Sequence, residues 1–150
     1  MKKLRYLVFL CLLLPLGLLA QNWETNIDTA LTKATNEDKH IILVFSGMDW
    51  CVPCVKMERN IWQKPEFQTY ANENLIMLKA DFPKKRKGEQ NTSQIEHNEK
   101  LKDLYNTKGL FPYIVLMNKE GESIGHTMYK NIEVSKYIGL INQIISDSKN

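Results

Sequence analysis

The chain has 150 residues, of which 43% are hydrophobic, and its 20 basic and 17 acidic side chains give a formal charge of +3. That length is sufficient for one domain with a hydrophobic core. The positive excess comes from Lys2, Lys3 and Arg5, because no acidic residue precedes Glu24. The rest of the chain has balanced charges, so its composition gives no reason to expect a nucleic-acid partner.

Residues 1–20 have the pattern of a secretory signal peptide. A positively charged start precedes an almost wholly apolar run over residues 6–19, and Ala20 supplies a small residue before a cleavage point at Gln21. The run has about 14 residues, whereas a membrane span needs roughly 20. We therefore expect an exported, periplasmic protein whose mature domain covers residues 21–150. An N-terminal anchor that is not cleaved is the alternative.

Hydrophobic periodicity and breaker residues predict the elements of the mature chain in order. We expect a helix over 24–36, a strand over 40–46, a helix from Cys51 to Trp62 and a short helix from Pro65. After these come a strand over 75–81, a basic loop over 84–88, a helix with a capping box at Ser93 and Glu96, strands over 113–117 and 122–129, and a closing helix from Val134. The helix after the basic loop takes its predicted apolar face from Leu101, Leu104 and Tyr105.

The order of these elements predicts the architecture. The segment between the strands at 40–46 and 75–81 is long enough for a helical crossover, so these strands are expected to be parallel. The strands at 113–117 and 122–129 are joined by a turn and are expected to form an antiparallel hairpin. A βαβ unit followed by a hairpin and a helix predicts an α/β domain with a central four-stranded mixed sheet and helices on both faces.

The mature chain keeps two cysteines, Cys51 and Cys54. An apolar run rich in β-branched residues precedes them at 41–45, and apolar side chains at helical spacing follow them at Met57 and Ile61. The pair therefore lies where a buried strand leads into a helix. Free N–H groups and the positive end of the helix dipole at such a place stabilise a thiolate, which is the reactive form of cysteine.

Three interpretations of Cys51 and Cys54 are open: a redox pair, a structural disulfide, or half of a metal site. A bridge across two intervening residues closes a tiny loop and removes little entropy from the unfolded chain. A metal site needs two more ligands, and the scattered His40, His97 and His126 do not offer them at ligand spacing. The redox interpretation is favoured, and no metal and no organic cofactor are expected.

The sequence around the cysteines resembles a known family. Trp50-Cys51-Val52-Pro53-Cys54 follows an apolar strand and is similar to the Trp-Cys-Gly-Pro-Cys active site of thioredoxins, from which only Val52 departs. The longer stretch from Phe45 to Cys54 resembles exported single-domain thioredoxin-like proteins of Gram-negative bacteria. The predicted element order also agrees with a thioredoxin-like fold, and the resemblance covers roughly residues 24–148.

The resemblance implies roles for residues near the cysteines. Phe111-Pro112 is similar to the place where thioredoxin-like proteins carry a cis-proline, which leaves the neighbouring backbone free to bind an extended substrate; an ordinary trans proline is the alternative. The expected substrate-binding residues are therefore Trp50, Pro53, Phe111 and Pro112. We favour Trp50 as a lid beside the disulfide over Trp50 as a packed aromatic.

One departure from the family concerns proton transfer. Thioredoxins keep a buried acid six positions before the first cysteine, and this chain has Phe45 there. Asp49 and Asp81 are the acids to consider in its place, and we assign a catalytic role to neither. A water or one of these acids serves instead, or resolution is slower than in thioredoxin.

The resemblance implies an exported thiol–disulfide oxidoreductase that reduces or reshuffles protein disulfides. Cys51 is the expected nucleophile and Cys54 the resolving cysteine, and a membrane thiol–disulfide electron donor is expected to reset the pair. A reducing pair is favoured because Val52 and Pro53 carry no charge. The alternatives are a disulfide oxidase or isomerase, and a non-catalytic binding module of the same fold. We expect a monomer.

Overall fold

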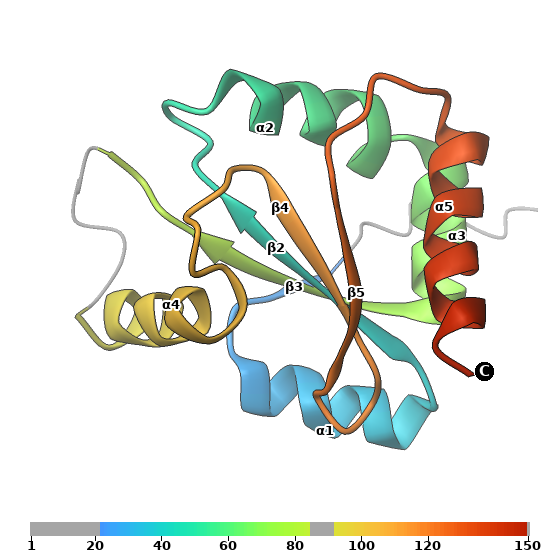
Figure 1. Cartoon of the computed structure of the whole chain (residues 1–150), viewed down its shortest axis with the longest axis horizontal. Coiled ribbons are helices and arrows are strands. Elements are labelled where there is room, and N and C mark those ends of the chain that lie inside the picture. The colour runs from blue at the N-terminus through green and yellow to red at the C-terminus, as the bar shows by residue number, and fades with distance from the viewer. Residues whose placement is uncertain (1–21, 85–91, 150) are drawn as a thin grey trace, which may run out of the picture.

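The computed structural model describes residues 22–84 and 92–149 (Figure 1). The predicted signal peptide at 1–20 and most of the basic loop at 84–88 lie outside the described residues. The elements are β1 (Trp23–Glu24), α1 (Ile27–Glu37), β2 (His40–Ser46), α2 (Val52–Met57), the π-helical segment η1 (Glu58–Trp62), α3 (Pro65–Asn74), β3 (Leu75–Asp81), α4 (Thr92–Tyr105), β4 (Tyr113–Met117), β5 (Ser123–Met128) and α5 (Val134–Asp147).

The described strands form one mixed sheet in the order β1-β3-β2-β4-β5. As predicted, β2 is parallel to β3, and β4 and β5 form an antiparallel hairpin. The expected number of four strands is wrong, because Trp23 and Glu24 pair with β3 as a fifth, edge strand. The first helix starts later than predicted, since the side chain of Asn26 caps it by accepting from the backbone N–H groups of Asp28 and Thr29.

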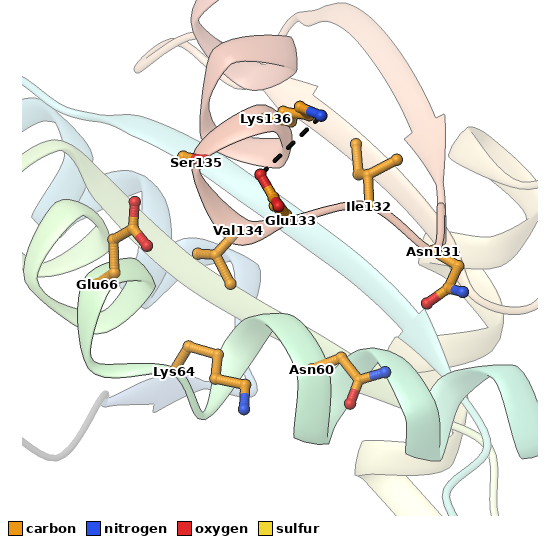
Figure 2. A pocket seen from close by; sticks show the side chains of 9 residues that line it. All are labelled: Asn60, Lys64, Glu66, Asn131, Ile132, Glu133, Val134, Ser135 and Lys136. Carbon is orange, nitrogen blue, oxygen red and sulfur yellow. Dashed lines mark ion pairs between the residues drawn. The ribbon is translucent and has the colours of Figure 1, made fainter.

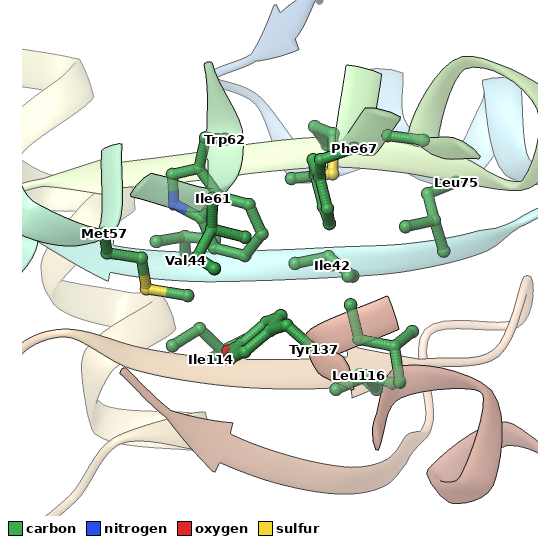
Figure 3. Close-up of a cluster of buried hydrophobic side chains, with 13 residues drawn as sticks. Ile42, Val44, Met57, Ile61, Trp62, Phe67, Leu75, Ile114, Leu116 and Tyr137 are labelled. Atoms are coloured by element: carbon green, nitrogen blue, oxygen red, sulfur yellow. The ribbon is translucent and has the colours of Figure 1, made fainter. Parts of the chain in front are cut away.

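β2 lies between β3 and β4 and is buried along almost its whole length. Its side chains alternate between two clusters. The cluster around Ile42 and Val44 packs with η1, α3 and α5 (Figure 3). The cluster around Leu43 and Phe45 packs with α1 and α4 on the other face. A strand buried on both faces shows no polar alternation, which explains the continuous apolar run at 41–45.

The helix predicted from Cys51 to Trp62 is one continuous segment whose second half is π-helical. Gln63 N–H donates to the carbonyl oxygen of Glu58 at the wider i to i−5 spacing, 2.9 Å away. Ile61 and Trp62 are both buried by this turn. The helix therefore stays packed on the sheet from the cysteines to its end.

α4 differs from its prediction in two respects. It begins at Thr92, so Ser93 lies inside the helix and the capping box at Ser93 is wrong. Leu104 is 71% exposed, whereas Asn98 is buried and donates from Nδ2 to the carbonyl oxygen of Asp81, 2.9 Å away. This helix carries few apolar side chains, and a buried amide completes its inner face.

Candidate active site

Cys51 and Cys54 are joined by a disulfide at the start of α2. β2 ends at Ser46, a tight loop follows, and Cys51 N–H donates to the carbonyl oxygen of Gly47, 2.7 Å away. Cys51 is the N-cap of α2, and its Sγ accepts a hydrogen bond from the backbone N–H of Cys54 at 3.3 Å. Pro53 lies in the first helical turn, where its missing N–H has no cost.

The surroundings of the disulfide are apolar and partly open. Cys51 and Cys54 themselves are nearly buried, at 4% and 3% exposed. The neighbouring side chains of Trp50 and Val52 are 43% and 63% exposed. Exposed apolar groups thus flank a disulfide that is nearly buried.

The Phe111–Pro112 peptide bond is cis, as the resemblance implies. Tyr113 pairs with Phe45 in the antiparallel register of β4 and β2, so Pro112 lies at the edge where β2 ends and the cysteine loop begins. The ring of Phe111 meets that of Trp50 edge-on, with 5.1 Å between centroids. The structure therefore brings together two segments that lie far apart in the sequence.

Phe82 is a member of this aromatic group that sequence reasoning did not find. Its ring lies 5.5 Å from that of Phe111, and its carbonyl oxygen accepts the indole N–H of Trp50 at 2.7 Å. Trp50 is thus both exposed and anchored, so the lid and the packed aromatic are not exclusive alternatives. Phe82 directly follows β3, and its position carries no motif that could have revealed the contact.

The two acids near the cysteines hold backbone groups. Asp81 lies at the end of β3 beside Ser46, and its Oδ1 accepts the N–H of Met48, 3.4 Å away. Asp49 is exposed and accepts the N–H of Lys84, 3.1 Å away. Burial raises the pKa of the Asp81 carboxyl above its ordinary value. Both acids therefore help to hold the loop before Cys51 against the end of β3.

Phe45 lies in the core, where thioredoxins have their buried acid. It is 0% exposed and pairs with Ala80 and Tyr113 on the two neighbouring strands. Its ring lies 6.4 Å from the rings of Phe82 and Tyr113. An aromatic cluster thus surrounds the sequence position at which thioredoxins have an acid.

A depression of about 770 Å³ lies at the junction of η1, α3 and the start of α5 (Figure 2). It is lined by charged and amide side chains, among them Asn60, Lys64 and Glu66, and by an ion pair of Glu133 with Lys136 at 4.0 Å. Neither cysteine lines it. Its lining mixes charges of both signs with amide and apolar side chains, and this mixture selects no one class of ligand.

Among residues 22–84 and 92–149, no three His, Cys, Asp or Glu side chains are grouped as metal ligands. Over the same ranges, no helix combines the length and the apolar character that crossing a membrane requires.

The sequence matches the family model for thioredoxin-like proteins over residues 22–119. The chain is 30% identical over 131 residues to the disulfide bond reductase DsbH of Chlamydia pneumoniae, which covers 87% of this chain and 76% of that protein. A solved structure titled DsbH oxidoreductase is similar with a TM-score of 0.77 and 30% identity, over 83% of this chain and 84% of that chain.

A solution structure of a thioredoxin from Thermus thermophilus shares the fold, with a TM-score of 0.62 and 14% identity, over 85% of this chain and 88% of that one. These similarities agree with the fold and the cysteine pair described above. The chain belongs to the thioredoxin-like family, as its Trp-Cys-Val-Pro-Cys motif predicts, and it is a thiol–disulfide oxidoreductase of that family.

Proposed function

We propose that Cys51 and Cys54 are the catalytic pair of an exported enzyme that reduces or reshuffles disulfides in client proteins. The observation that carries this proposal is the N-cap position of Cys51, whose Sγ accepts the Cys54 N–H at 3.3 Å. Once the bridge is reduced, the same N–H and the helix dipole stabilise a thiolate at Cys51.

The chemistry is two successive thiol–disulfide exchanges. The Cys51 thiolate attacks one sulfur of a client disulfide, and the other client sulfur leaves as a thiolate, which gives a mixed disulfide. Cys54 then loses its proton, and its thiolate attacks the Cys51 sulfur. The Cys51–Cys54 bridge forms, and the client leaves with both sulfurs reduced. Two electrons pass from enzyme to client, and no cofactor is needed.

The client is bound as an extended segment beside the disulfide. Trp50 and Phe111 supply an aromatic edge, and Pro53 and Pro112 flank the sulfurs without offering N–H groups of their own. The exposed part of Trp50 supports this assignment, because an apolar side chain near a reactive sulfur gains by being covered. The chain acts as a monomer, since one domain carries the complete pair.

The expected direction is reduction. A strong oxidant stabilises its reduced thiolate with nearby positive charge, and Val52 and Pro53 offer none. The formal charges nearby are Asp49, which disfavours a thiolate at Cys51, and Lys56 in the last turn of α2, which favours it, so the two roughly cancel. The pair is therefore a better reductant than an oxidase pair.

The compartment and the electron source follow from the N-terminal segment. Residues 1–20 carry the pattern of a signal peptide, so the enzyme works outside the cytoplasm, in the periplasm. A reducing pair in an oxidising compartment becomes oxidised with each turnover. A membrane thiol–disulfide carrier is the class of partner that resets it.

The experiment that tests this proposal is the reduction potential of the pair, measured by equilibration with glutathione and dithiothreitol buffers. We expect a value nearer that of thioredoxin, about −270 mV, than that of a strong oxidant, about −120 mV. A value above about −180 mV would replace the reductase with an oxidase or isomerase. Failure to reduce insulin with dithiothreitol as donor would favour a non-catalytic binding module.

A further inference from the structure

Asn106 holds both main-chain groups of one residue in the loop before β4. Its Oδ1 accepts the N–H of Leu110 at 2.9 Å, and its Nδ2 donates to the carbonyl oxygen of Leu110 at 2.8 Å. Asn106 is 2% exposed, so this amide is shielded from water. One side chain thus makes the pair of hydrogen bonds that a neighbouring strand would otherwise make.

The clamp formed by Asn106 and Leu110 is anchored in a helix. Asn106 follows α4 directly, and its own N–H donates to the carbonyl oxygen of Lys102, 2.8 Å away. Gly109 closes the turn with an N–H donated to the Asn106 carbonyl oxygen at 2.8 Å, and its φ of 61° is the left-handed conformation that glycine adopts readily. The loop therefore continues the rigid end of α4.

The residues that the clamp holds adjoin the active site. Leu110 has a 37% exposed apolar side chain, and Phe111 follows it with its ring against Trp50. Phe111 is held by ring contacts with Trp50 and Phe82, and Leu110 is held by the two hydrogen bonds from its main chain to Asn106. An exposed leucine held by its backbone presents its side chain to a partner with little further loss of conformational entropy.

We propose that Asn106 is a positioning residue for client binding, which holds Leu110 so that its side chain contacts an apolar side chain of an extended protein client. This inference rests on the proposed function, and it adds a specificity-determining residue to it. The clamp acts on the client side of the site and not on the sulfurs. Small disulfides, which lack an extended chain to contact Leu110, should be indifferent to it.

The test compares Asn106→Ala with Leu110→Ser in the reduction of insulin and of oxidised glutathione, with dithiothreitol as donor. Each variant should raise the KM for insulin about fivefold and leave its kcat within about twofold. The reduction potential and the rate with oxidised glutathione should stay at the wild-type level. A loss of folded protein alone would lower the rates with insulin and with glutathione together. A change in the insulin KM alone therefore distinguishes a positioning role from an effect on stability.

The double variant Asn106→Ala with Leu110→Ser tests whether the two residues act as a unit. If Asn106 works through Leu110, the insulin KM of the double variant equals that of Leu110→Ser. Once the leucine side chain is gone, holding its backbone in place no longer affects client binding. Multiplied effects in the double variant would overturn the proposal. So would an unchanged insulin KM in Asn106→Ala.

The chain offers a matched control at the other end of β4. Asn118 Oδ1 also accepts the N–H of the residue four positions later, Glu122, at 2.8 Å, and it lies in the β4–β5 turn. Asn118→Ala should leave both the insulin KM and the glutathione rate unchanged. If Asn106→Ala does not fold, Leu110→Ser keeps the inference testable, because the bonds of Asn106 go to the main chain of Leu110, and this variant should still raise the KM for insulin and leave the glutathione rate unchanged.

Failure of the proposed function gives a different result from failure of this inference. A wild-type protein that does not reduce insulin overturns both. A wild-type protein that reduces insulin, together with an Asn106→Ala variant of unchanged KM, overturns the role of Asn106 alone. A higher KM for glutathione as well as insulin would assign Asn106 to the sulfurs and not to the client.

Discussion

The indole N–H of Trp50 donates a 2.7 Å hydrogen bond to the carbonyl oxygen of Phe82. A second bond joins the same segments, because Asp81 accepts the N–H of Met48. The loop at 47–50 that leads to the cysteines is thus tied to the end of β3 by side chains from both segments. An exposed tryptophan beside the disulfide is in this way also part of what holds the loop.

Trp50→Phe should lower the free energy of unfolding of the oxidised protein by about 1 kcal/mol or less. The phenyl ring keeps the contact with Phe111, but it has no donor for the Phe82 carbonyl oxygen. Urea unfolding of wild type and variant measures the difference. Trp50→Ala removes the ring contact as well, so its loss should be larger. Equal stability of wild type and Trp50→Phe would show that the hydrogen bond makes no net contribution.

Several elements could be predicted from the sequence to the residue. The strands β2, β3 and β4 have their predicted bounds because each is a buried apolar run that ends at a polar or breaker residue. The helix after the cysteines could also be predicted, since Pro53 is favoured in a first turn and the apolar spacing continues to Ile61. Here local pattern and tertiary burial agree.

The other features depend on contacts between distant residues. Trp23 and Glu24 form a strand because β3 offers a free edge, and two residues are too few to show a period. Leu101 and Leu104 have the same helical pattern, yet packing buries only the first. The hydrogen bonds from Asn106 to Leu110 could not be predicted from the sequence either. An asparagine at the end of a helix usually indicates only that the helix ends there.

Alkylation of the reduced protein near neutral pH should label Cys51 before Cys54. The Cys54 N–H and the start of α2 stabilise the Cys51 thiolate, whereas Cys54 lies within the first turn. In the disulfide form the two cysteines are almost equally buried, so we expect the difference to arise mainly from thiolate stability. Mass spectrometry after brief iodoacetamide treatment measures the two rates. Faster labelling of Cys54 would reverse the assigned roles.

The same roles predict which single variant retains clients. Cys54→Ser should accumulate mixed disulfides with client proteins, because the intermediate at Cys51 then has no resolving thiol. Cys51→Ser should accumulate few. Non-reducing gels of the two variants, isolated after acid quenching, make the comparison, with the double serine variant as the control for adventitious crosslinks. Equal trapping by both single variants would contradict a fixed nucleophile.

Export should leave a mature chain that begins at Gln21. The charged start, the apolar run at 6–19 and the small Ala20 motivate this cleavage point. Mass spectrometry of the protein from the native cell envelope identifies its N-terminus. Ala20→Arg places a large charged residue at the cleavage point and should leave the precursor uncut. An intact Met1 in the cytoplasmic fraction of the wild type would contradict export.

Asp81 should make stability fall as pH rises through the range just above the ordinary Asp pKa. Burial raises the pKa of Asp81, so the folded protein binds this proton more tightly than the unfolded chain does. Asp81→Asn removes the titration and keeps an acceptor for Met48 N–H. The stability of the variant relative to wild type, from urea unfolding, should therefore increase with pH across that range. A constant difference would contradict the burial of the carboxyl.

Asp38 should show the opposite slope. The hydrogen bond from Lys119, followed by its charge, lowers the pKa of the Asp38 carboxyl, so the ionised form favours folding. Its contribution is present above the ordinary Asp pKa and is lost as pH falls through the lowered value. The advantage of wild type over Asp38→Asn should thus increase with pH. Asp38 has a φ of 52°, which asparagine also tolerates. Any difference in the free energy of unfolding that comes from this backbone conformation is therefore independent of pH. Because both side chains of the pair are exposed, about 1 M salt should flatten this slope, and a slope unaffected by salt would exclude the ion pair as its cause.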